Sequence, residues 1–538
     1  MCGILAIIGK GKDEQVVREL SGRMSHRGPD ERDIHLMEKG HYLAHERLSI
    51  IDLHTGKQPI QGTSSAWMVH NGEIYNHQEL RDTILKDHTF RTTSDSEVIV
   101  HLYEKFGYDF CDLLDGMFAF VVIDGDDYIA SRDPLGIKPL YYGLDERGRM
   151  YFASEMKSIA DQCKTFSTFP PGHYYTPETG FVKYYQPKWE DPEAAVEALD
   201  LAALRDTLTT SVKKRLMSDV PIGVLLSGGL DSSLTSSIAS RLMKEQGKTL
   251  HSFSIGLDAH APDVVAARDV AAFLGTQHHE IHFTIEQGIE ILDKLIWHLE
   301  TYDVTSVRAS TPMYFLSKAI TEKGIKVVLS GEGADEIFGG YLYFRNAPSV
   351  EDFQKETVER VQKLFTADLL RADKSTMAHG LEARVPFLDK AFLELAIKIK
   401  PEEKMPQTYE GVEKYILRKA FDTPEQPYLP DSVLWRQKEQ FSDGVGYSWI
   451  DTLIEFAASR VSDEDFAKAS ELFPYNTPVT KEAFYYRTIF HKHFPQTAAA
   501  QTVRKWIPKW QENQDPSGRA NTAHVQAEPY IAKPIVHS

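Results

Sequence analysis

The sequence predicts two domains of different class: an α+β sandwich at the N-terminus, and then an α/β domain with a doubly wound parallel sheet and a helical C-terminal part. Two patterns indicate this. Short strands separated by turns fill residues 1–187, whereas from residue 201 strands alternate with helices. The length of 538 residues also exceeds what one ordinary core accommodates, so more than one domain is expected.

In residues 1–187 the apolar patterns predict short strands punctuated by helices. The strands are expected at 69–73, 117–124, 127–131 and 181–185, and the helices at 16–24 and 96–106. Residues 186–192 contain two prolines and mixed charge, which is typical of a linker. We therefore predict a domain over 1–187 and a linker over 188–200.

From residue 201 the predicted elements alternate, which is the signature of a parallel sheet covered by helices. Strands are expected at 222–226, 250–255, 278–283 and 326–329, and helices at 201–217, 232–245, 264–274, 286–299 and 312–322. Beyond residue 351 the pattern is mostly helical as far as 494. The second domain is thus predicted over 201–512, followed by a tail at 513–538 that has no periodicity and is expected to be flexible.

The composition excludes several functional classes. Acidic residues outnumber basic ones by 78 to 60, and the net charge of −18 argues against a nucleic-acid partner held through phosphate contacts. Three cysteines with no C-x-x-C pair exclude a disulfide framework and a structural zinc site. The longest apolar run, 117–123, is far shorter than the roughly 20 residues of a membrane span. With no signal peptide recognised, we expect a cytoplasmic protein without membrane contact.

Cys2 stands directly after the initiator methionine. Removal of Met1 would leave a thiol and a free α-amine on the same residue, and the amine titrates at about 7.7 to 8.0, near the optimum for a base at neutral pH. Such a residue combines nucleophile and base without a histidine partner. By itself, however, a cysteine at this position is often accidental.

The segment Ser227–Ser233 (S-G-G-L-D-S-S) follows a predicted strand and precedes a predicted helix. Gly228 and Gly229 allow a tight turn in which successive N–H groups, the helix N-terminus and the serine hydroxyls face one concavity. This arrangement binds phosphate or pyrophosphate. Asp231 would repel a phosphate but suits a bridging Mg²⁺. The alternative is an ordinary glycine-rich turn.

A second loop, Ser330–Glu336 (S-G-E-G-A-D-E), follows the last predicted strand of the same sheet. Its three carboxylates repel one another unless a cation is present or one of them is protonated. We predict that Asp335 is a second metal ligand facing Asp231, and that Glu332 accepts a proton from an attacking amine. A solvated acidic loop is the alternative.

These motifs resemble a known family. Ser227–Ser233 is similar to the pyrophosphate loop of the N-type ATP pyrophosphatases, while residues 2–4, 26–30, 47–50 and 71–76 resemble the class II glutaminases. In this order they resemble the glutamine-dependent asparagine synthetases, most of all the bacterial form. Residues 300–303, 308–310, 380–389, 436–444 and 515–519 carry the resemblance along the chain.

The resemblance implies an N-terminal nucleophile fold in which Cys2 attacks the glutamine amide. The Asn71 side-chain amide and the Gly72 N–H would then form the oxyanion hole. Arg47 suits the α-carboxylate, and Glu73 and Asp95 suit the α-ammonium. Taken without the family, Asn71-Gly72 reads as a hairpin turn and Arg47 and Asp95 as surface charges. His26 is assigned a structural role.

For the second domain the resemblance implies that Mg-ATP converts aspartate into a β-aspartyl-adenylate, from which ammonia displaces AMP to give asparagine. Arg308 and Lys438 are the basic groups predicted near the phosphates, with surface positions as the alternative, and Lys438 is also expected to be catalytic.

A homodimer is implied. Rival readings are another amidotransferase, a β-lactam-type synthetase, or a silent binding or storage homologue. The implied ATP and pyrophosphate contacts are Leu225, Ser227, Gly228, Gly229, Asp231, Ser232, Ile255, Arg308, Ser330 and Gly331.

Overall fold

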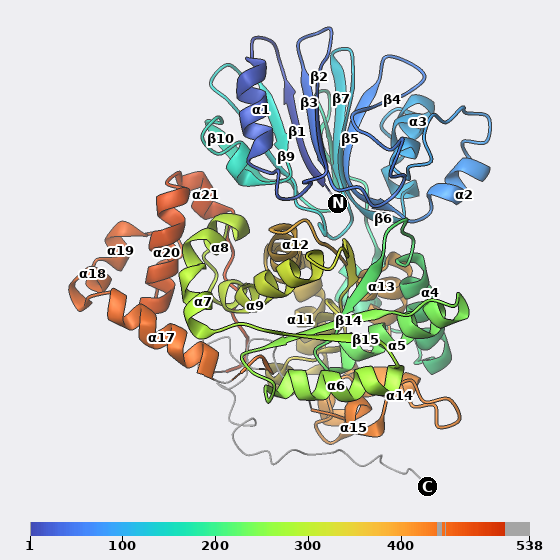
Figure 1. Ribbon diagram of the computed structural model, residues 1–538, viewed down its shortest axis with the longest axis vertical. Coiled ribbons are helices and arrows are strands. Elements are labelled where there is room, and N and C mark those ends of the chain that lie inside the picture. Colours follow the sequence, from blue (N-terminus) through green and yellow to red (C-terminus); the bar gives the residue numbers. More distant parts are fainter. Residues whose placement is uncertain (1, 438–443, 447, 512–538) are drawn as a thin grey trace.

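The computed structural model describes residues 2–437, 444–446 and 448–511. Figure 1 shows two bodies stacked along the long axis: a strand-rich body built from the N-terminal third, and a larger body with a sheet and many helices. The start of β1 (Cys2–Ile8) lies at the junction between them. The predicted tail and Lys438 lie outside the described residues.

The N-terminal body is a sandwich of two antiparallel sheets. One has the order β10-β8-β9-β1-β3-β2 and the other β12-β11-β7-β6-β5-β4. Ile4 and Leu43 from the first sheet pack against Val69 and Val121 from the second. The strands are β2 (Glu31–Leu36), β3 (Tyr42–Arg47), β4 (Ile60–Gln61), β5 (Trp67–Ile74), β6 (Gly116–Asp124), β7 (Asp127–Arg132), β8 (Tyr141–Leu144), β9 (Met150–Ala153), β10 (Thr165–Thr168), β11 (His173–Thr176) and β12 (Gly180–Lys183).

Helices cover the outer faces of both sheets. Val17 and Leu20 of α1 (Glu14–Gly22) pack on Leu5 of β1, while α3 (Glu97–Phe106) packs on Phe118 of β6. Because both faces of each sheet are covered, β1 and β6 read as continuous apolar runs rather than as alternating ones. The α+β sandwich predicted from the sequence is confirmed.

The second body contains a parallel sheet in the order β15-β14-β13-β16-β17, also as predicted. Its strands are β13 (Ile222–Leu225), β14 (His251–Gly256), β15 (Gln277–His282), β16 (Val327–Leu329) and β17 (Glu382–Arg384). The principal helices are α4 (Leu201–Lys214), α5 (Leu230–Glu245), α6 (Pro262–Leu274), α7 (Ile285–Glu290), α8 (Leu292–Leu299), α9 (Val304–Thr321), α10 (Ala334–Phe338), α11 (Val350–Lys363), α12 (Asp368–Met377), α13 (Lys390–Ile397), α14 (Tyr415–Phe421), α17 (Ser448–Arg460) and α20 (Lys481–His493).

The structure differs from the sequence prediction at three places. Strand β17 was not predicted. The helix expected to start at Pro312 starts eight residues earlier, so the proline lies inside α9. The Asp303 side chain caps this helix by accepting a hydrogen bond from the Ser306 N–H. The helix expected over 286–299 is divided into α7 and α8. Within the part of the chain described here, none of the helices has the length and apolarity needed to cross a membrane.

Buried charges join the two bodies. The Arg27 guanidinium donates to Glu155 in its own domain at 2.9 Å and to Asp373 of α12 at 2.8 Å. Glu300 accepts from the backbone N–H groups of Met156 and Lys157. Since removing one partner of a buried ion pair is strongly destabilising, these contacts fix the position of the sandwich on the parallel sheet.

Candidate active sites

Cys2 lies at the first position of β1, buried against β3, with Arg47 directly opposite it in register. Its backbone N–H donates to Asn71 Oδ1 at 2.9 Å, and its Sγ lies 4.0 Å from the Leu48 carbonyl. Burial raises the pKa of the Cys2 thiol above its ordinary value. The thiol therefore needs a base close by to act as a nucleophile at neutral pH.

Asn71 and Gly72 lie in the middle of β5, opposite Ala119 and Phe118 of β6, so they do not form the hairpin turn considered above. Asn71 Nδ2 is buried and makes no hydrogen bond with the described residues. Gly72 has a φ of +148°, and a Cβ there would lie 1.9 Å from the Met117 carbonyl oxygen. The strand thus presents the Asn71 amide donor beside Cys2. The next position accepts only glycine, because a side chain there would collide with the backbone of β6.

Two buried carboxylates lie on or beside the same strand. Asp95 Oδ2 accepts from the Ile74 N–H at 2.8 Å, and burial raises the Asp95 pKa to about 6. Glu73 Oε1 lies 3.3 Å from an Arg384 guanidinium nitrogen, and Glu73 Oε2 makes no hydrogen bond among the described residues. Burial, followed by the nearby Glu382 carboxylate, raises the pKa of Glu73.

Arg47 is already paired in this structure. Its guanidinium donates to Glu31 at 2.8 Å and to the Asp52 carbonyl at 2.6 Å. The Glu31 side chain is 37% exposed, whereas Arg47 is buried. His26 lies on the domain junction, where its ring meets Glu155 and His298 rather than Cys2. This position agrees with the structural role expected for His26.

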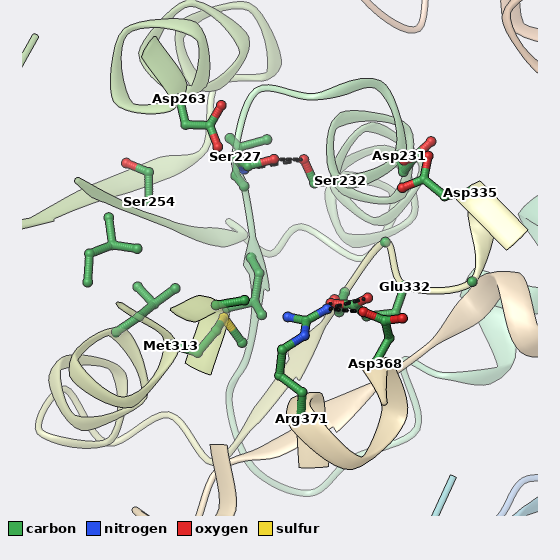
Figure 2. A pocket seen from close by; sticks show the side chains of 18 of the residues that line it. Ser227, Asp231, Ser232, Ser254, Asp263, Met313, Glu332, Asp335, Asp368 and Arg371 are labelled. Atoms are coloured by element: carbon green, nitrogen blue, oxygen red, sulfur yellow. Dashed lines mark hydrogen bonds and ion pairs between the residues drawn. The ribbon is translucent and has the colours of Figure 1, made fainter. Parts of the chain in front are cut away.

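The predicted pyrophosphate loop connects β13 to α5. The Ser227 and Ser232 hydroxyls lie 3.0 Å apart, and a Cβ at Gly228 (φ +74°) would meet Ala266 Cβ at 2.5 Å (Figure 2). Seven of the predicted ATP-contact residues line one cavity, namely Leu225, Ser227, Asp231, Ser232, Ile255, Ser330 and Gly331. Gly229 lines an adjoining basic pocket with Lys414, Arg418 and Arg436, and the Gly228 carbonyl accepts from Arg436 at 3.3 Å.

Asp231 and Asp335 come together from the first turns of α5 and α10, two helices that follow the neighbouring strands β13 and β16 (Figure 2). Between them lies the Lys414 ammonium, 2.7 and 2.8 Å from the Asp231 oxygens and 2.8 Å from Asp335 Oδ1. Two convergent carboxylates beside a phosphate-binding loop fit Mg²⁺, which is usually held by one or two carboxylates together with substrate phosphates. The described residues contain no group of three or more His, Cys, Asp or Glu placed to hold a metal ion.

The three carboxylates of the Ser330–Glu336 loop are each accommodated differently. Both oxygens of Glu332 lie 3.0 Å from Arg371, which also reaches Asp368 at 3.1 Å (Figure 2). Asp335 meets Lys414. Burial, followed by the Asp368 and Asp335 charges, raises the pKa of Glu336 to about 8, so Glu336 is protonated at neutral pH and bonds with the Tyr341 hydroxyl. The loop thus uses both of the solutions anticipated from the sequence, a cation and a protonated acid.

Arg308 does not lie where it was predicted. It is buried in α9, and its guanidinium donates to Glu482 of α20 at 2.9 and 2.6 Å. The expectation that it contacts phosphates came from the family resemblance and from the need for positive charge beside a triphosphate, whereas in the structure this charge is paired with Glu482. Conversely, Lys414, Arg371 and Asp368 were missed because no local motif marks them. Only the excess negative charge of Asp231 and of the Ser330–Glu336 loop indicated that basic partners were needed.

Comparison with known proteins covers nearly the whole chain. The glutamine amidotransferase domain family matches residues 1–176, and the asparagine synthase family matches 203–356 and 346–516. "Asparagine synthetase [glutamine-hydrolyzing] 1" of Arabidopsis thaliana is 50% identical over 97% of this chain and 93% of its own length. A "probable asparagine synthetase [glutamine-hydrolyzing]" of Dictyostelium discoideum is 51% identical over 98% and 99%, respectively. Both relatives are eukaryotic, so they lend no support to a particular likeness to the bacterial form.

Among solved structures, one described as the allosteric regulatory enzyme of purine biosynthesis matches 52% of this chain and 80% of its own at 16% identity. Its TM-score of 0.32 is too low for any conclusion.

Proposed function

Since the chain belongs to the glutamine-hydrolysing asparagine synthetases, we propose how its own residues carry out the two half-reactions. The enzyme releases ammonia from glutamine in the N-terminal domain and uses ATP and aspartate to make asparagine in the second. Aspartate is activated as an adenylate, because a bare carboxylate is a poor acceptor for an amine and AMP is a good leaving group. The residue roles are assigned from these two half-reactions.

In the glutaminase domain, Cys2 Sγ attacks the amide carbon of glutamine after removal of Met1. The liberated α-amine of Cys2 takes the thiol proton and delivers it to the departing ammonia, leaving a thioester that water hydrolyses to glutamate. Asn71 Nδ2 and the Gly72 N–H stabilise the oxyanion of the tetrahedral intermediate. Asn71 Oδ1, which accepts from the Cys2 nitrogen, orients both the base and this donor.

Glutamine is held through its charged ends. Arg47 receives the α-carboxylate in exchange for Glu31, while Glu73 and Asp95 receive the α-ammonium. The assignment of the α-ammonium to Glu73 is supported by Glu73 Oε2, a buried acceptor with no hydrogen bond to the described residues. Such an atom carries a desolvation cost that a bound ammonium removes.

In the synthetase domain, Ser227, Gly229 and Ser232 bind the phosphates with hydroxyl and backbone donors at the start of α5. Asp231 and Asp335 would hold Mg²⁺, which supplies the positive charge that offsets the pyrophosphate as it leaves. Glu332 takes the proton from the attacking ammonia, and Arg371 orients its carboxylate. We retain Lys438 as a proposed catalytic group and propose no phosphate contact for Arg308.

The observation that carries the glutaminase assignment is the buried Asn71 Nδ2 beside Cys2, which makes no hydrogen bond within the described part of the chain. The test is to supply glutamine, aspartate and Mg-ATP to the purified protein, which should give asparagine, AMP and pyrophosphate in equal amounts. Formation of ADP would contradict adenylation, and absence of synthesis would favour a silent homologue. A β-lactam-type reaction would leave aspartate unconsumed. The proposed homodimer and cytoplasmic location are tested separately, by sedimentation and by cell fractionation.

A further inference from the structure

Arg384 of the synthetase domain reaches into the glutaminase domain. It ends β17, the edge strand of the parallel sheet, and is completely buried. One of its guanidinium nitrogens lies 3.3 Å from Glu73 Oε1 on β5 of the sandwich. A side chain of one domain is thus in direct contact with a proposed substrate ligand of the other.

The rest of the Arg384 side chain is held by its own domain. Its Nε donates to Glu382 at 2.5 Å, and Nη1 donates to the carbonyls of Arg215 at 2.8 Å and Met217 at 2.5 Å. Its backbone carbonyl accepts from the Ser330 N–H at 2.8 Å, at the start of the acidic loop. The three side-chain bonds fix the direction in which the guanidinium faces Glu73, because three acceptors restrain one planar fork.

Glu73 needs such a partner. Burial and the Glu382 carboxylate both raise its pKa, whereas the Arg384 charge opposes them. With Arg384 beside Oε1, the other oxygen, Oε2, makes no hydrogen bond among the described residues.

We propose that Arg384 is a positioning residue for glutamine, supplied by the synthetase domain, which holds one oxygen of Glu73 and aims the second at the substrate's α-ammonium. The glutamine site is then complete only when the two domains are docked. This inference rests on the proposed role of Glu73.

The test compares two reagents that alkylate Cys2. The chloromethyl ketone analogue of glutamine carries an α-ammonium, whereas iodoacetamide carries none. Arg384→Met should slow labelling of Cys2 by the chloroketone about tenfold to a hundredfold and raise the KM for glutamine by a similar factor, as expected for loss of a charge-assisted contact. Labelling by iodoacetamide should stay within about twofold of the wild-type rate, since it does not use Glu73.

Lys214→Met is the matched control. Lys214 also bridges the domains, donating to Asp115 at 2.7 Å and to Asp389 at 3.1 Å, but it does not contact Glu73. An equal loss of chloroketone selectivity in this variant would show that docking in general matters and would overturn the specific role of Arg384. Unchanged selectivity and KM in Arg384→Met would overturn it as well.

Arg384→Lys keeps the positive charge and is the second variant to measure if Arg384→Met fails to fold. It should show a smaller decrease in chloroketone labelling and a smaller rise in KM for glutamine. In a Glu73→Gln background, Arg384→Met should have little further effect, because the partner is already removed. An additive loss would contradict the proposal. If the chloroketone fails to label Cys2 of the wild-type protein, the proposed glutaminase function is wrong, which is a distinguishable outcome.

Discussion

Lys414 is the residue whose replacement has the most specific predicted consequence. Its side chain is only 1% exposed and lies between Asp231 and Asp335, whose side chains are 12% and 13% exposed. Lys414→Met leaves two nearly buried carboxylates facing each other with no ammonium between them. Breaking a buried ion pair costs about 3–5 kcal/mol, and the slight exposure of both aspartates favours the lower end, about 3 kcal/mol.

A divalent cation should restore most of that loss. If Mg²⁺ binds the two carboxylates of the variant, a concentration of about 100 times its Kd adds about 2.7 kcal/mol to the stability of the folded state. In the wild-type protein the ammonium already occupies this position, so Mg²⁺ without nucleotide should have a much smaller effect. The synthetase domain of Lys414→Met is therefore expected to unfold several degrees lower than that of the wild type, and to recover on addition of Mg²⁺.

The assay is thermal unfolding with and without Mg²⁺, in the absence of nucleotide. Lys419→Met is the control, because Lys419 lies in α14, the helix that Lys414 directly precedes, but pairs with Asp422 at the surface, where such pairs contribute little. Equal stabilisation of variant and wild type by Mg²⁺ would refute the reasoning. So would a Lys414→Met protein as stable as the wild type.

Three further predictions concern other parts of the two sites. Asn71→Ala should lower the kcat of glutamine hydrolysis about a hundredfold to a thousandfold with little change in KM, because its amide acts on the transition state; a pure KM effect in steady-state kinetics would contradict this. Glu336 has a raised pKa of about 8 against an ordinary 4.5, so the folded state binds its proton more tightly than the unfolded state. Its contribution to stability should be present below pH 4.5 and decline as the pH rises towards 8, and Glu336→Gln should remove that decline in unfolding curves measured across this range. Arg308→Met should destabilise the fold by about 3–5 kcal/mol, since it leaves Glu482 buried without its partner; a raised KM for ATP with unchanged stability would instead restore Arg308 to the phosphate site.

The sequence was informative where function depends on local chain geometry. The S-G-G-L-D-S-S loop has to follow a strand and open a helix, and parallel strands end at one edge of the sheet. Asp231 and Asp335 were therefore expected to meet, and they do. The hairpin reading of Asn71-Gly72 failed because β5 pairs along its whole length with β6, which a two-residue signal does not reveal.

Groups that arrive from distant segments escaped prediction. Lys414 is 183 positions from Asp231 and comes from a segment outside the sheet. Strand β17 is a three-residue stretch, Glu-Ala-Arg, with no apolar run to mark it, because two of its three side chains are charged and pair with each other. Arg308 was misplaced for the opposite reason, since a basic residue shows its charge in the sequence but not the carboxylate that neutralises it.

The central claim, that Cys2 makes the ammonia consumed at the second site, is tested most directly by following the nitrogen. Glutamine labelled with heavy nitrogen in its amide is supplied with aspartate, Mg-ATP and unlabelled ammonium. The wild-type protein should place the heavy nitrogen in asparagine, with one AMP formed for each asparagine. Cys2→Ala should make asparagine from the unlabelled ammonium alone. Heavy asparagine from the Cys2→Ala protein would contradict the account.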